Sequence, residues 1–382
     1  MPAASRLAQL HRFGQSPWLD HIDRELVARG GLRRMVDRDA LGGVTTNATI
    51  FEKAVAAGKA YDEQILELAR EGLGAPAILD RLAVDDVRAA CDVLGPVYMG
   101  SGGEDGFVSV EVAPALANDA AAAIAEAQRL FAAVDRPNVM IEIPGTPEGV
   151  AAALEAMRQG LNVNVTLLFT VAHYEAVADA YLEALEFRLR RDLTIRALSS
   201  VASVFVSRVD TAVDAALQER MAAADGDERR RLAALQGRAG VANAKVVYER
   251  FRSYLGGRDW QLIAASGAKI QRLLWAGTGV HDPAYPDVMY ADELIGDHTV
   301  IALAETTWKA FNDHGTPART ADRHLEDAHR LLRELGRQGI DVERVGGQLQ
   351  SRGVELLLEA WDRAVAVVEA RRIALLGREV TT

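Results

Sequence analysis

The sequence predicts an α/β fold in which parallel strands alternate with helices, either as an open doubly wound sheet or as a closed eight-stranded barrel. Short apolar runs recur through most of the chain, and helical patterns lie between them. The composition, 49% hydrophobic and 25% charged over 382 residues, is typical of a globular α/β protein with a sizeable core.

The strands are expected at seven apolar runs: 42–47, 107–112, 138–143, 162–169, 201–207, 269–276 and 299–305. Helical patterns between them include 118–134, 148–159, 173–191 and 241–254. This alternation suits parallel strands joined by helical crossovers.

Two segments fall outside the alternation and are expected to be helical, an insertion at about 212–240 and a C-terminal tail at about 321–380. In the tail, apolar residues such as Leu331, Leu335 and Leu357 recur at helical spacing. We expect these helices to pack on the barrel exterior, as parts of one domain spanning 1–382, rather than to bind a partner. Packing across a homodimer interface stays open.

The charge pattern argues against several functions. The net charge is −11 with acids and bases interleaved, which disfavours a nucleic-acid partner. Cys91 is the only cysteine, and no Cys/His spacing is typical of a metal site. The N-terminal sequence does not resemble a signal peptide, and no apolar run is long enough to span a bilayer, so we expect a cytoplasmic protein with no membrane contact.

Several predicted strands carry polar residues at every second position, where parallel strands buried on both faces are usually apolar. These residues are Ser109, Glu111, Glu142, Asn162, Asn164 and Thr166. Each set lies late in its strand, where barrel enzymes place their chemistry, and residues i and i+2 share a face. The pattern predicts a site, in preference to a polar core whose members only satisfy one another.

Five motifs resemble the transaldolase family, in its longer actinobacterial-type branch: GGVTTNATIFEKA, NVMIEIPGTPEGVAA, GLNVNVTLLFTVAHYEAV, ASVFVSRVDTAVD and GAKIQRLLWAGTGVHDP. The resemblance implies a (β/α)8 TIM-type barrel of the class I aldolase kind, with a circularly permuted strand order. It also implies transfer of a dihydroxyacetone unit between sugar phosphates, through a Schiff base on a lysine of the fourth strand, with neither metal nor organic cofactor.

The family lysine belongs to a K-I-P motif that reads E-I-P in this chain, so the resemblance assigns the lysine's position to Glu142. The family reaction needs an amine that attacks a carbonyl and then holds an iminium as an electron sink. A carboxylate forms no iminium, so Glu142 cannot perform this step.

The resemblance also assigns chemical roles to three other residues. Asp20 would be the acid/base that moves the proton of the hydroxyl at the bond being broken. Glu111 and Thr166 would hold the water used to form and hydrolyse the Schiff base. Carboxylates suit such roles because their pKa can be tuned by their surroundings.

The remaining matched positions would bind a phosphorylated or polyhydroxylated small substrate. Asn47 and Asn164 would bind hydroxyl groups, and Ser203, Arg208 and Arg272 would hold the phosphate. Paired guanidinium groups suit phosphate because each presents a planar fork of donors.

Further site motifs depart from the family. Ala48 follows Asn47 where a proline is usual, Gly277 and His281 stand where a serine and a lysine are usual, and residues 301–307 lack the usual T-M-P. Changes in several motifs indicate a naturally diverged paralogue rather than one engineered substitution.

We therefore expect altered acid/base chemistry on a sugar phosphate or similar polyol: isomerisation, dehydration or an aldol step without an amine. One alternative is a catalytically silent protein that binds a sugar phosphate or a partner. Another is a true transaldolase with a relocated lysine such as Lys269, which strand alternation would place on the face opposite Arg272. Lys245 is expected on a solvated helix face.

Overall fold

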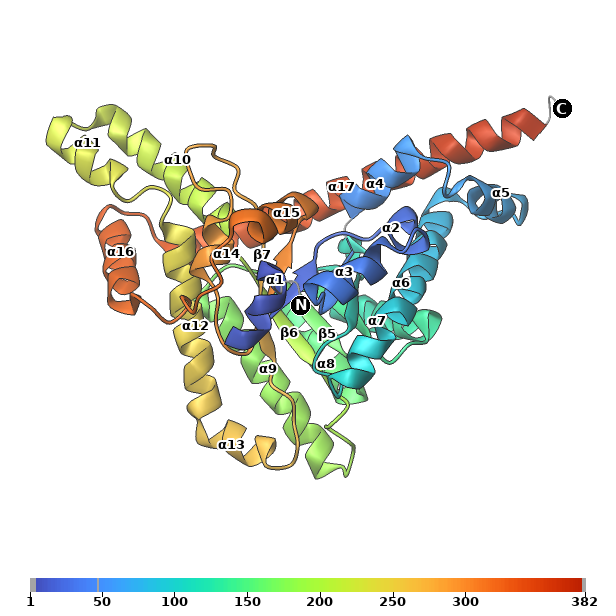
Figure 1. Ribbon diagram of the computed structural model, residues 1–382, viewed down its shortest axis with the longest axis horizontal. Helices are drawn as coiled ribbons and strands as arrows, with labels where there is room; N and C mark the ends of the chain where they lie inside the picture. Colours follow the sequence, from blue (N-terminus) through green and yellow to red (C-terminus); the bar gives the residue numbers. More distant parts are fainter. Residues whose placement is uncertain (1–4, 47, 380–382) are drawn as a thin grey trace.

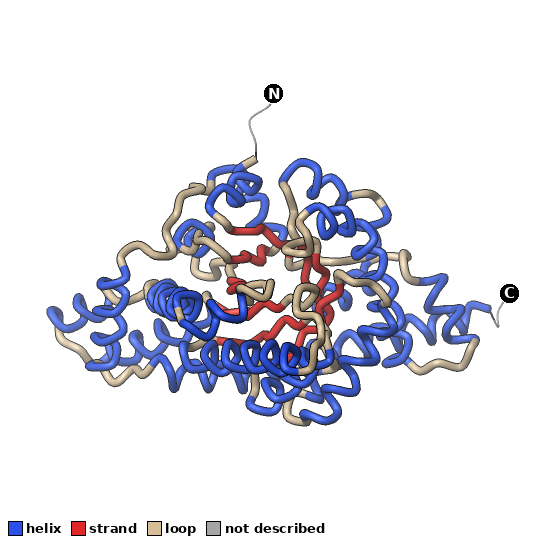
Figure 2. The backbone as a smooth tube through the Cα atoms, turned by 90° about the horizontal axis from the view of Figure 1, so that it is seen from below, coloured by secondary structure: helices blue, strands red, loops and turns tan. Residues whose placement is uncertain are grey.

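A computed structural model describes residues 5–46 and 48–379 and shows a closed parallel barrel, which confirms the predicted fold class. Within this part of the chain the strands run in sequence order, and β1 pairs with both β2 and β8. They are β1 (Gln15–Leu19), β2 (Gly43–Thr45), β3 (Phe107–Glu111), β4 (Val139–Pro144), β5 (Val163–Leu168), β6 (Ser200–Phe205), β7 (Arg272–Ala276) and β8 (Thr299–Leu303). Figure 2 shows these strands in the middle of the molecule with helices around them.

Seven of the strands coincide with apolar runs that the sequence predicts, and β1 was missed. Its sequence, QSPWL, contains a proline and polar residues, so it does not read as a strand. All five of its residues are nevertheless buried, and β8 supplies the main pairing partner in register from Gln15 to Leu19. Asp20 therefore follows a barrel strand rather than starting a helix.

The helices surround the barrel and extend from it (Figure 1). The first part of the chain forms α1 (Arg6–Leu10), η1 (His11–Phe13), α2 (Arg24–Ala28), α3 (Gly31–Asp39), α4 (Ala48–Ala57), α5 (Asp62–Arg70) and α6 (Ala75–Gly100). The middle part forms η2 (Pro114–Leu116), α7 (Ala120–Val134), α8 (Pro147–Gln159), α9 (Val171–Arg190), α10 (Ser207–Ala223), α11 (Gly226–Ala233), α12 (Ala239–Gly256) and α13 (Arg258–Ala264). The last part forms α14 (Met289–Glu293), α15 (Glu305–His314), α16 (Leu325–Arg337) and α17 (Val342–Glu379).

Helix starts follow from local sequence at the strands that carry the site. After β4, the Thr146 side chain accepts a hydrogen bond from the Gly149 backbone N–H, and Pro147 begins α8. After β5, Thr170 caps α9 in the same way by accepting from the His173 N–H. In both cases the helix begins within a few residues of the strand end, so the carboxyl end of each strand lies close to the start of a capped helix.

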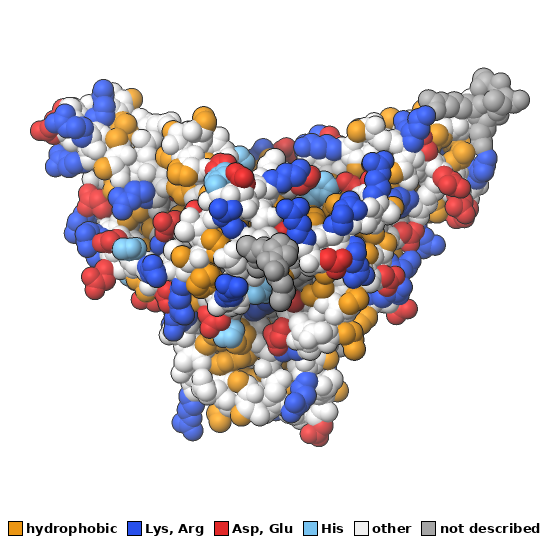
Figure 3. All heavy atoms as spheres, in the orientation of Figure 1, with side chains coloured by type: hydrophobic (Ala, Val, Ile, Leu, Met, Phe, Trp, Pro, Cys, Tyr) orange, Lys and Arg blue, Asp and Glu red, His pale blue; other side chains and the backbone are white. Residues whose placement is uncertain are grey.

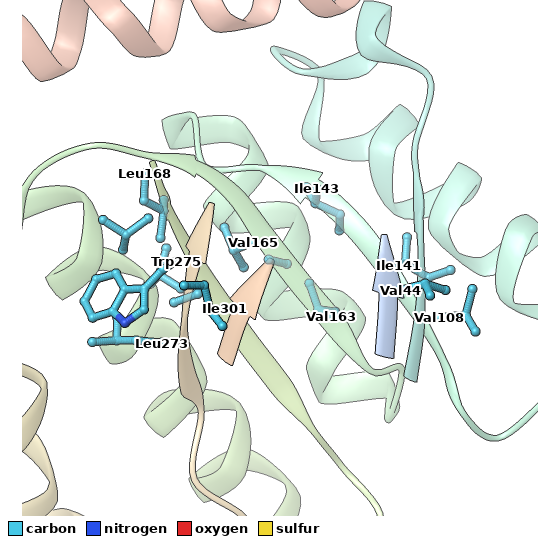
Figure 4. Packing of buried hydrophobic residues seen from close by; sticks show 14 of the residues in the cluster. Val44, Val108, Ile141, Ile143, Val163, Val165, Leu168, Leu273, Trp275 and Ile301 are labelled. Atoms are coloured by element: carbon cyan, nitrogen blue, oxygen red, sulfur yellow. The ribbon is translucent and has the colours of Figure 1, made fainter. Parts of the chain in front are cut away.

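The barrel wall separates an apolar outer face from a partly polar interior. Residues at alternate positions of the strands, such as Ile141, Ile143, Val163 and Val165, pack outward against the helices (Figure 4). Inside the barrel lies a separate apolar cluster, made up of Trp18, Phe107, Met140, Val201, Leu274, Ala276, Val300 and Ala302. The polar residues that break the apolar runs share this inward face.

The C-terminal helix α17 crosses the carboxyl side of the barrel. The Gln350 side-chain amide of α17 donates hydrogen bonds to the carbonyl oxygens of Gly145 (2.8 Å) and Leu167 (3.1 Å), which follow or end strands β4 and β5. Beyond this crossing, α17 packs along α4, α5 and α6, and α17 forms one arm of the molecule together with α4 and α5 (Figure 1). Helices α10 and α11 form the arm on the other side.

Charged side chains of both signs are mixed over the face drawn in Figure 3, with no extended region of one sign. Within the described residues, no helix combines the length and apolar character needed to cross a membrane.

Candidate active site

Three neighbouring strands place a hydrogen-bonded polar group inside the barrel. The Ser109 hydroxyl of β3 donates to Glu142 Oε2 of β4 at 2.8 Å, and the Asn164 amide of β5 donates to the same oxygen at 3.0 Å. Asn164 also donates to Ser109 Oγ at 3.0 Å. Because Glu142 is only 7% exposed, and Ser109 and Asn164 are fully buried, this triangle fixes the Glu142 side chain.

The group continues onto β5 and β6. The Ser203 hydroxyl donates to Asn164 Oδ1 at 2.6 Å, and the Thr166 hydroxyl hydrogen-bonds to the Glu142 carboxyl group. Ser203 reaches Asn164 because it lies two residues beyond Val201, the register partner of Asn164, and therefore on the same face of the sheet. The structure therefore brings Ser203, Asn164, Thr166 and Glu142 together.

Three carboxyl groups, Asp20, Glu111 and Glu142, form what we call the carboxylate cluster. Glu111 and Glu142 are register partners on β3 and β4, so their side chains leave the same face of the barrel wall. Asp20 follows β1, where its backbone N–H is bonded to the Leu303 carbonyl and its carboxylate accepts from the Thr45 hydroxyl at 2.9 Å. The charges of Glu142 and Asp20 raise the pKa of Glu111, and the charge of Asp20 raises the pKa of Glu142, which shows that the three groups are close together.

Glu142 and Glu111 hold protons more tightly than isolated carboxyl groups do. Burial raises the pKa of Glu142 to about 7, against the opposing effect of hydrogen bonds from Ser109, Thr166 and Asn164. Burial, with the charges of Glu142 and Asp20, raises the pKa of Glu111 well above its ordinary value. At neutral pH the cluster can therefore both donate and accept protons, which is what general acid–base catalysis requires.

Arg208 lies at the start of α10, directly beyond the carboxyl end of β6. Its guanidinium lies 5.5 Å from the ring centroid of Phe205, and burial lowers the pKa of Arg208. Among the described residues no carboxylate pairs with it. A partly buried guanidinium of this kind is suited to binding an anionic group of a ligand.

Arg272 does not join this site. It is the first residue of β7, at the opposite, amino end of the barrel, and donates to Asp105 Oδ1 at 2.8 Å and to the Glu104 carbonyl at 2.7 Å. Asp105 also accepts from Ser16 and Trp18 of β1. The expectation that Arg272 holds the substrate phosphate is therefore wrong, because a strand's first residue and its carboxyl end lie on opposite sides of the barrel.

Lys269 lies at the same amino end and precedes β7, so the expected strand alternation between it and Arg272 is also wrong. Its ammonium donates to the Gly103 carbonyl at 2.6 Å and lies 6.0 Å from the centre of the Tyr98 ring. Burial lowers the pKa of Lys269. This placement separates Lys269 from the carboxylate cluster by the length of the barrel interior.

The chain has four other lysines. Lys53, Lys59 and Lys309 are exposed, and Lys309 pairs with Glu305. Lys245, expected on a solvated face, is instead buried and donates to Glu293 at 2.7 Å, because α12 packs against α16 and the segment around α14. Among the described residues, no hydrogen bond or ion pair joins a lysine to Glu111 or Glu142.

Asn47, predicted to bind a substrate hydroxyl, lies outside the described residues. In the part of the chain that the structure describes, no group of three or more His, Cys, Asp or Glu side chains is arranged to hold a metal ion.

Sequence reasoning missed Thr45 and Gln350, which position site residues. Thr45 anchors Asp20, and its place in a three-residue strand gave no pattern to read. Gln350 holds the Leu167 carbonyl directly after Thr166, at a backbone φ of +60° that is rare for leucine. The contact spans 183 residues, so no local signal could reveal it.

The fold and the site define an α/β-barrel protein with a carboxylate-rich centre at the carboxyl end of its strands. The family model described as Transaldolase/Fructose-6-phosphate aldolase matches residues 17–368. A protein of Thiobacillus denitrificans named Transaldolase is 40% identical over 357 residues, which cover 94% of this chain and 98% of that protein. A Mycolicibacterium paratuberculosis protein of the same name is 43% identical over 357 residues, covering 93% and 94%. The chain belongs to the transaldolase family.

Proposed function

We propose that this protein binds a phosphorylated polyhydroxy carbonyl compound at the carboxyl end of its barrel and transfers protons on it through carboxyl groups, without a Schiff base. Family membership supports a sugar-phosphate ligand. Arg208 and Ser203 would hold the phosphate, and Asn47 and Asn164 would hold hydroxyl groups. The observation that carries the proposal is the carboxyl group of Glu142, held by three donors at the position that the E-I-P motif assigns to the nucleophile.

The reaction we infer is an enolisation. The Asp20 carboxylate accepts the proton from the carbon beside the carbonyl, while protonated Glu142 gives its proton to the carbonyl oxygen. The product is an enediol. The protonated base then gives its proton to the former carbonyl carbon, while ionised Glu142 accepts the proton of the hydroxyl on the neighbouring carbon, which becomes the new carbonyl and completes an isomerisation. A dehydration or an aldol cleavage would begin from the same proton transfers.

Proton NMR in D2O tests this proposal with fructose 6-phosphate and other sugar phosphates. Enolisation replaces the hydrogen beside the carbonyl with deuterium, so its signal should fade with the wild-type protein. With Glu142→Gln the exchange should slow by about a hundredfold or more. Binding without exchange of any substrate offered would support the silent sugar-phosphate-binding alternative and refute the proposed chemistry.

The second candidate is the family's own reaction, transfer of a dihydroxyacetone unit. The relatives' shared name, Transaldolase, favours it over a changed reaction. It requires an amine in the barrel, and Lys269, the relocated nucleophile considered from the sequence, hydrogen-bonds to Gly103 at the amino end. The lysine placement is therefore the reason to prefer carboxylate chemistry.

A further inference from the structure

Helix α17 borders the part of the barrel rim that carries the candidate site. It packs on α4 after β2, on η2 after β3 and on α10 after β6, and it also contacts β5 itself. Its Gln350 is bonded to Gly145, which follows β4. A single helix therefore touches the carboxyl ends, or the connections that follow them, of five consecutive strands.

Strand β5 contains one extra residue relative to its partner β6. Val165 pairs with Ala202 and Leu168 pairs with Val204, so three steps along β5 match two steps along β6. Val165 and Leu168 both pack in the outer apolar cluster (Figure 4), although residues three apart in a regular strand point to opposite faces. This bulge therefore allows Thr166 to face the barrel interior while Leu168 faces the helices.

Leu167 is the residue at which the backbone of β5 departs from a regular strand. Its φ is +60°, a left-handed conformation that leucine rarely adopts and that persists only where the surroundings hold it. The Gln350 side-chain amide donates to the Leu167 carbonyl, and the Gly145 backbone N–H donates to the Thr166 carbonyl at 2.7 Å. Because Gln350 also donates to the Gly145 carbonyl, the carbonyl groups on both sides of Leu167 are held.

The Leu167 side chain is held by the same helix. Gly353 lies three residues beyond Gln350, and a Cβ atom at this position would lie 2.9 Å from Leu167 Cδ2 and 3.2 Å from Cδ1. Leu167 is buried in an apolar cluster that includes Val354 of α17. Gln350 and Gly353 thus fit the carbonyl group and the side chain of one residue in the bulge.

We propose that Gln350 is a positioning residue of the candidate active site, which holds the bulge at Leu167 and thereby keeps the Thr166 hydroxyl on the Glu142 carboxyl group. The hydrogen bond from Thr166 favours the ionised form of Glu142 and opposes the effect of burial on its pKa. Without this donor Glu142 should hold its proton more tightly and be a weaker acid. The catalytic consequence rests on the proposed function, in which Glu142 gives its proton to the carbonyl oxygen.

Infrared spectroscopy from about pH 5 to about pH 9 measures the proton on Glu142 without any ligand. The band of its protonated carboxyl group is identified by its loss in Glu142→Gln. In the wild-type protein this band should be half lost at about pH 7. In Thr166→Val and in Gln350→Leu the midpoint should rise by about 0.5–1 pH unit, because each change removes the same donor. Asp20 and Glu111, the charged groups beside Glu142, are the same in all these proteins.

The double variant Thr166→Val/Gln350→Leu tests whether Gln350 acts through Thr166. Its midpoint should equal that of Thr166→Val alone, because the second change then has no donor left to displace. A sum of the two single shifts would overturn the proposal, since Gln350 would then act on Glu142 by another route. Gln348→Leu makes the same substitution at an exposed position of α17 and should match the wild-type protein.

A second pair of variants tests the bulge if Gln350→Leu fails to fold, as judged by circular dichroism. Gly353→Ala presses on the buried Leu167 side chain and should raise the midpoint in the same direction. Gly347→Ala is its control, because a Cβ atom there meets nothing within 4 Å. Equal midpoints in these two variants would overturn the proposal.

The reaction provides an independent measurement. With fructose 6-phosphate in D2O, Gln350→Leu should lower kcat for hydrogen exchange by about two- to tenfold and leave KM unchanged. The pH above which exchange declines should move upward together with the infrared midpoint.

The infrared and exchange results bear on different claims. An unchanged infrared midpoint in folded Gln350→Leu, whatever its stability, would overturn the proposal and leave α17 a structural helix. The expected infrared shifts without any exchange by the wild-type protein would refute the proposed function and would uphold the positioning of Thr166 by Gln350.

Discussion

The pH dependence of stability should report the buried Glu142 directly. In the unfolded chain a glutamate loses its proton near 4.5, whereas in the folded protein the pKa of Glu142 is about 7. Between these values the folded state binds a proton that the unfolded state does not, so the free energy of unfolding falls as pH rises. The difference between the two values corresponds to about 3 kcal/mol, fully lost above pH 7.

Replacing Glu142 with glutamine removes this titration while keeping the side-chain shape. The amide oxygen can still accept from Ser109 and Asn164. At pH 5, where Glu142 is protonated, we expect wild-type and Glu142→Gln proteins to have similar stability. At pH 8.5 the variant should be more stable, by up to about 3 kcal/mol.

Urea unfolding followed by circular dichroism at pH 5 and pH 8.5 measures this difference. Other acids titrate in the same range, including Asp210, whose burial raises its pKa to about 6. Subtracting wild type from variant at each pH removes their contribution. Glu219→Gln serves as the matched control. Parallel pH dependences for wild type and Glu142→Gln would refute a buried, proton-binding Glu142.

Three other substitutions distinguish residues that stabilise the fold from residues that bind the ligand. Arg272→Met leaves the buried Asp105 carboxylate with only Ser16 and Trp18 as side-chain donors, so the free energy of unfolding should drop by roughly 3–5 kcal/mol. The affinity for fructose 6-phosphate at pH 7.5 should stay the same. A loss of affinity without a loss of stability would show that Arg272 belongs to the substrate site. Gln350→Leu leaves the carbonyls of Gly145 and Leu167 without their side-chain donor, so the free energy of unfolding measured by thermal unfolding should fall by about 1–3 kcal/mol. An unchanged midpoint would mean that α17 does not stabilise these strand ends. Arg208→Gln should weaken inorganic phosphate binding by about tenfold in calorimetry, and undiminished binding would place the anion elsewhere.

Much of the barrel could be predicted from the sequence because buried parallel strands read as apolar runs between helical patterns. In β4, Ile141 and Ile143 point toward the surrounding helices, and Glu142 between them points to the opposite, inner face of the barrel. This alternation predicts a polar centre inside the barrel. Strand β1 could not be found this way, because Gln15 and Pro17 interrupt the apolar pattern. The strand is buried by the elements around it, including its pairing partner β8.

The site residues were predictable to different degrees. Ser109, Glu142 and Asn164 meet because consecutive strands pair in register, so spacing within each strand was sufficient. Arg272 was misplaced because an apolar run does not say where its strand begins, and β7 starts three residues after Lys269. The contact of Gln350 with the ends of β4 and β5 depends on the path of α17, which no local pattern specifies.

The central claim is that no amine of this protein reacts with a sugar carbonyl. Intact-mass analysis after incubation with fructose 6-phosphate and borohydride tests it most directly, with Glu142→Lys treated in parallel. The account predicts no added mass on the wild-type protein and, on the variant, the mass of one reduced dihydroxyacetone unit. Added mass on a lysine of the wild-type protein would contradict the account and favour the family's Schiff-base reaction.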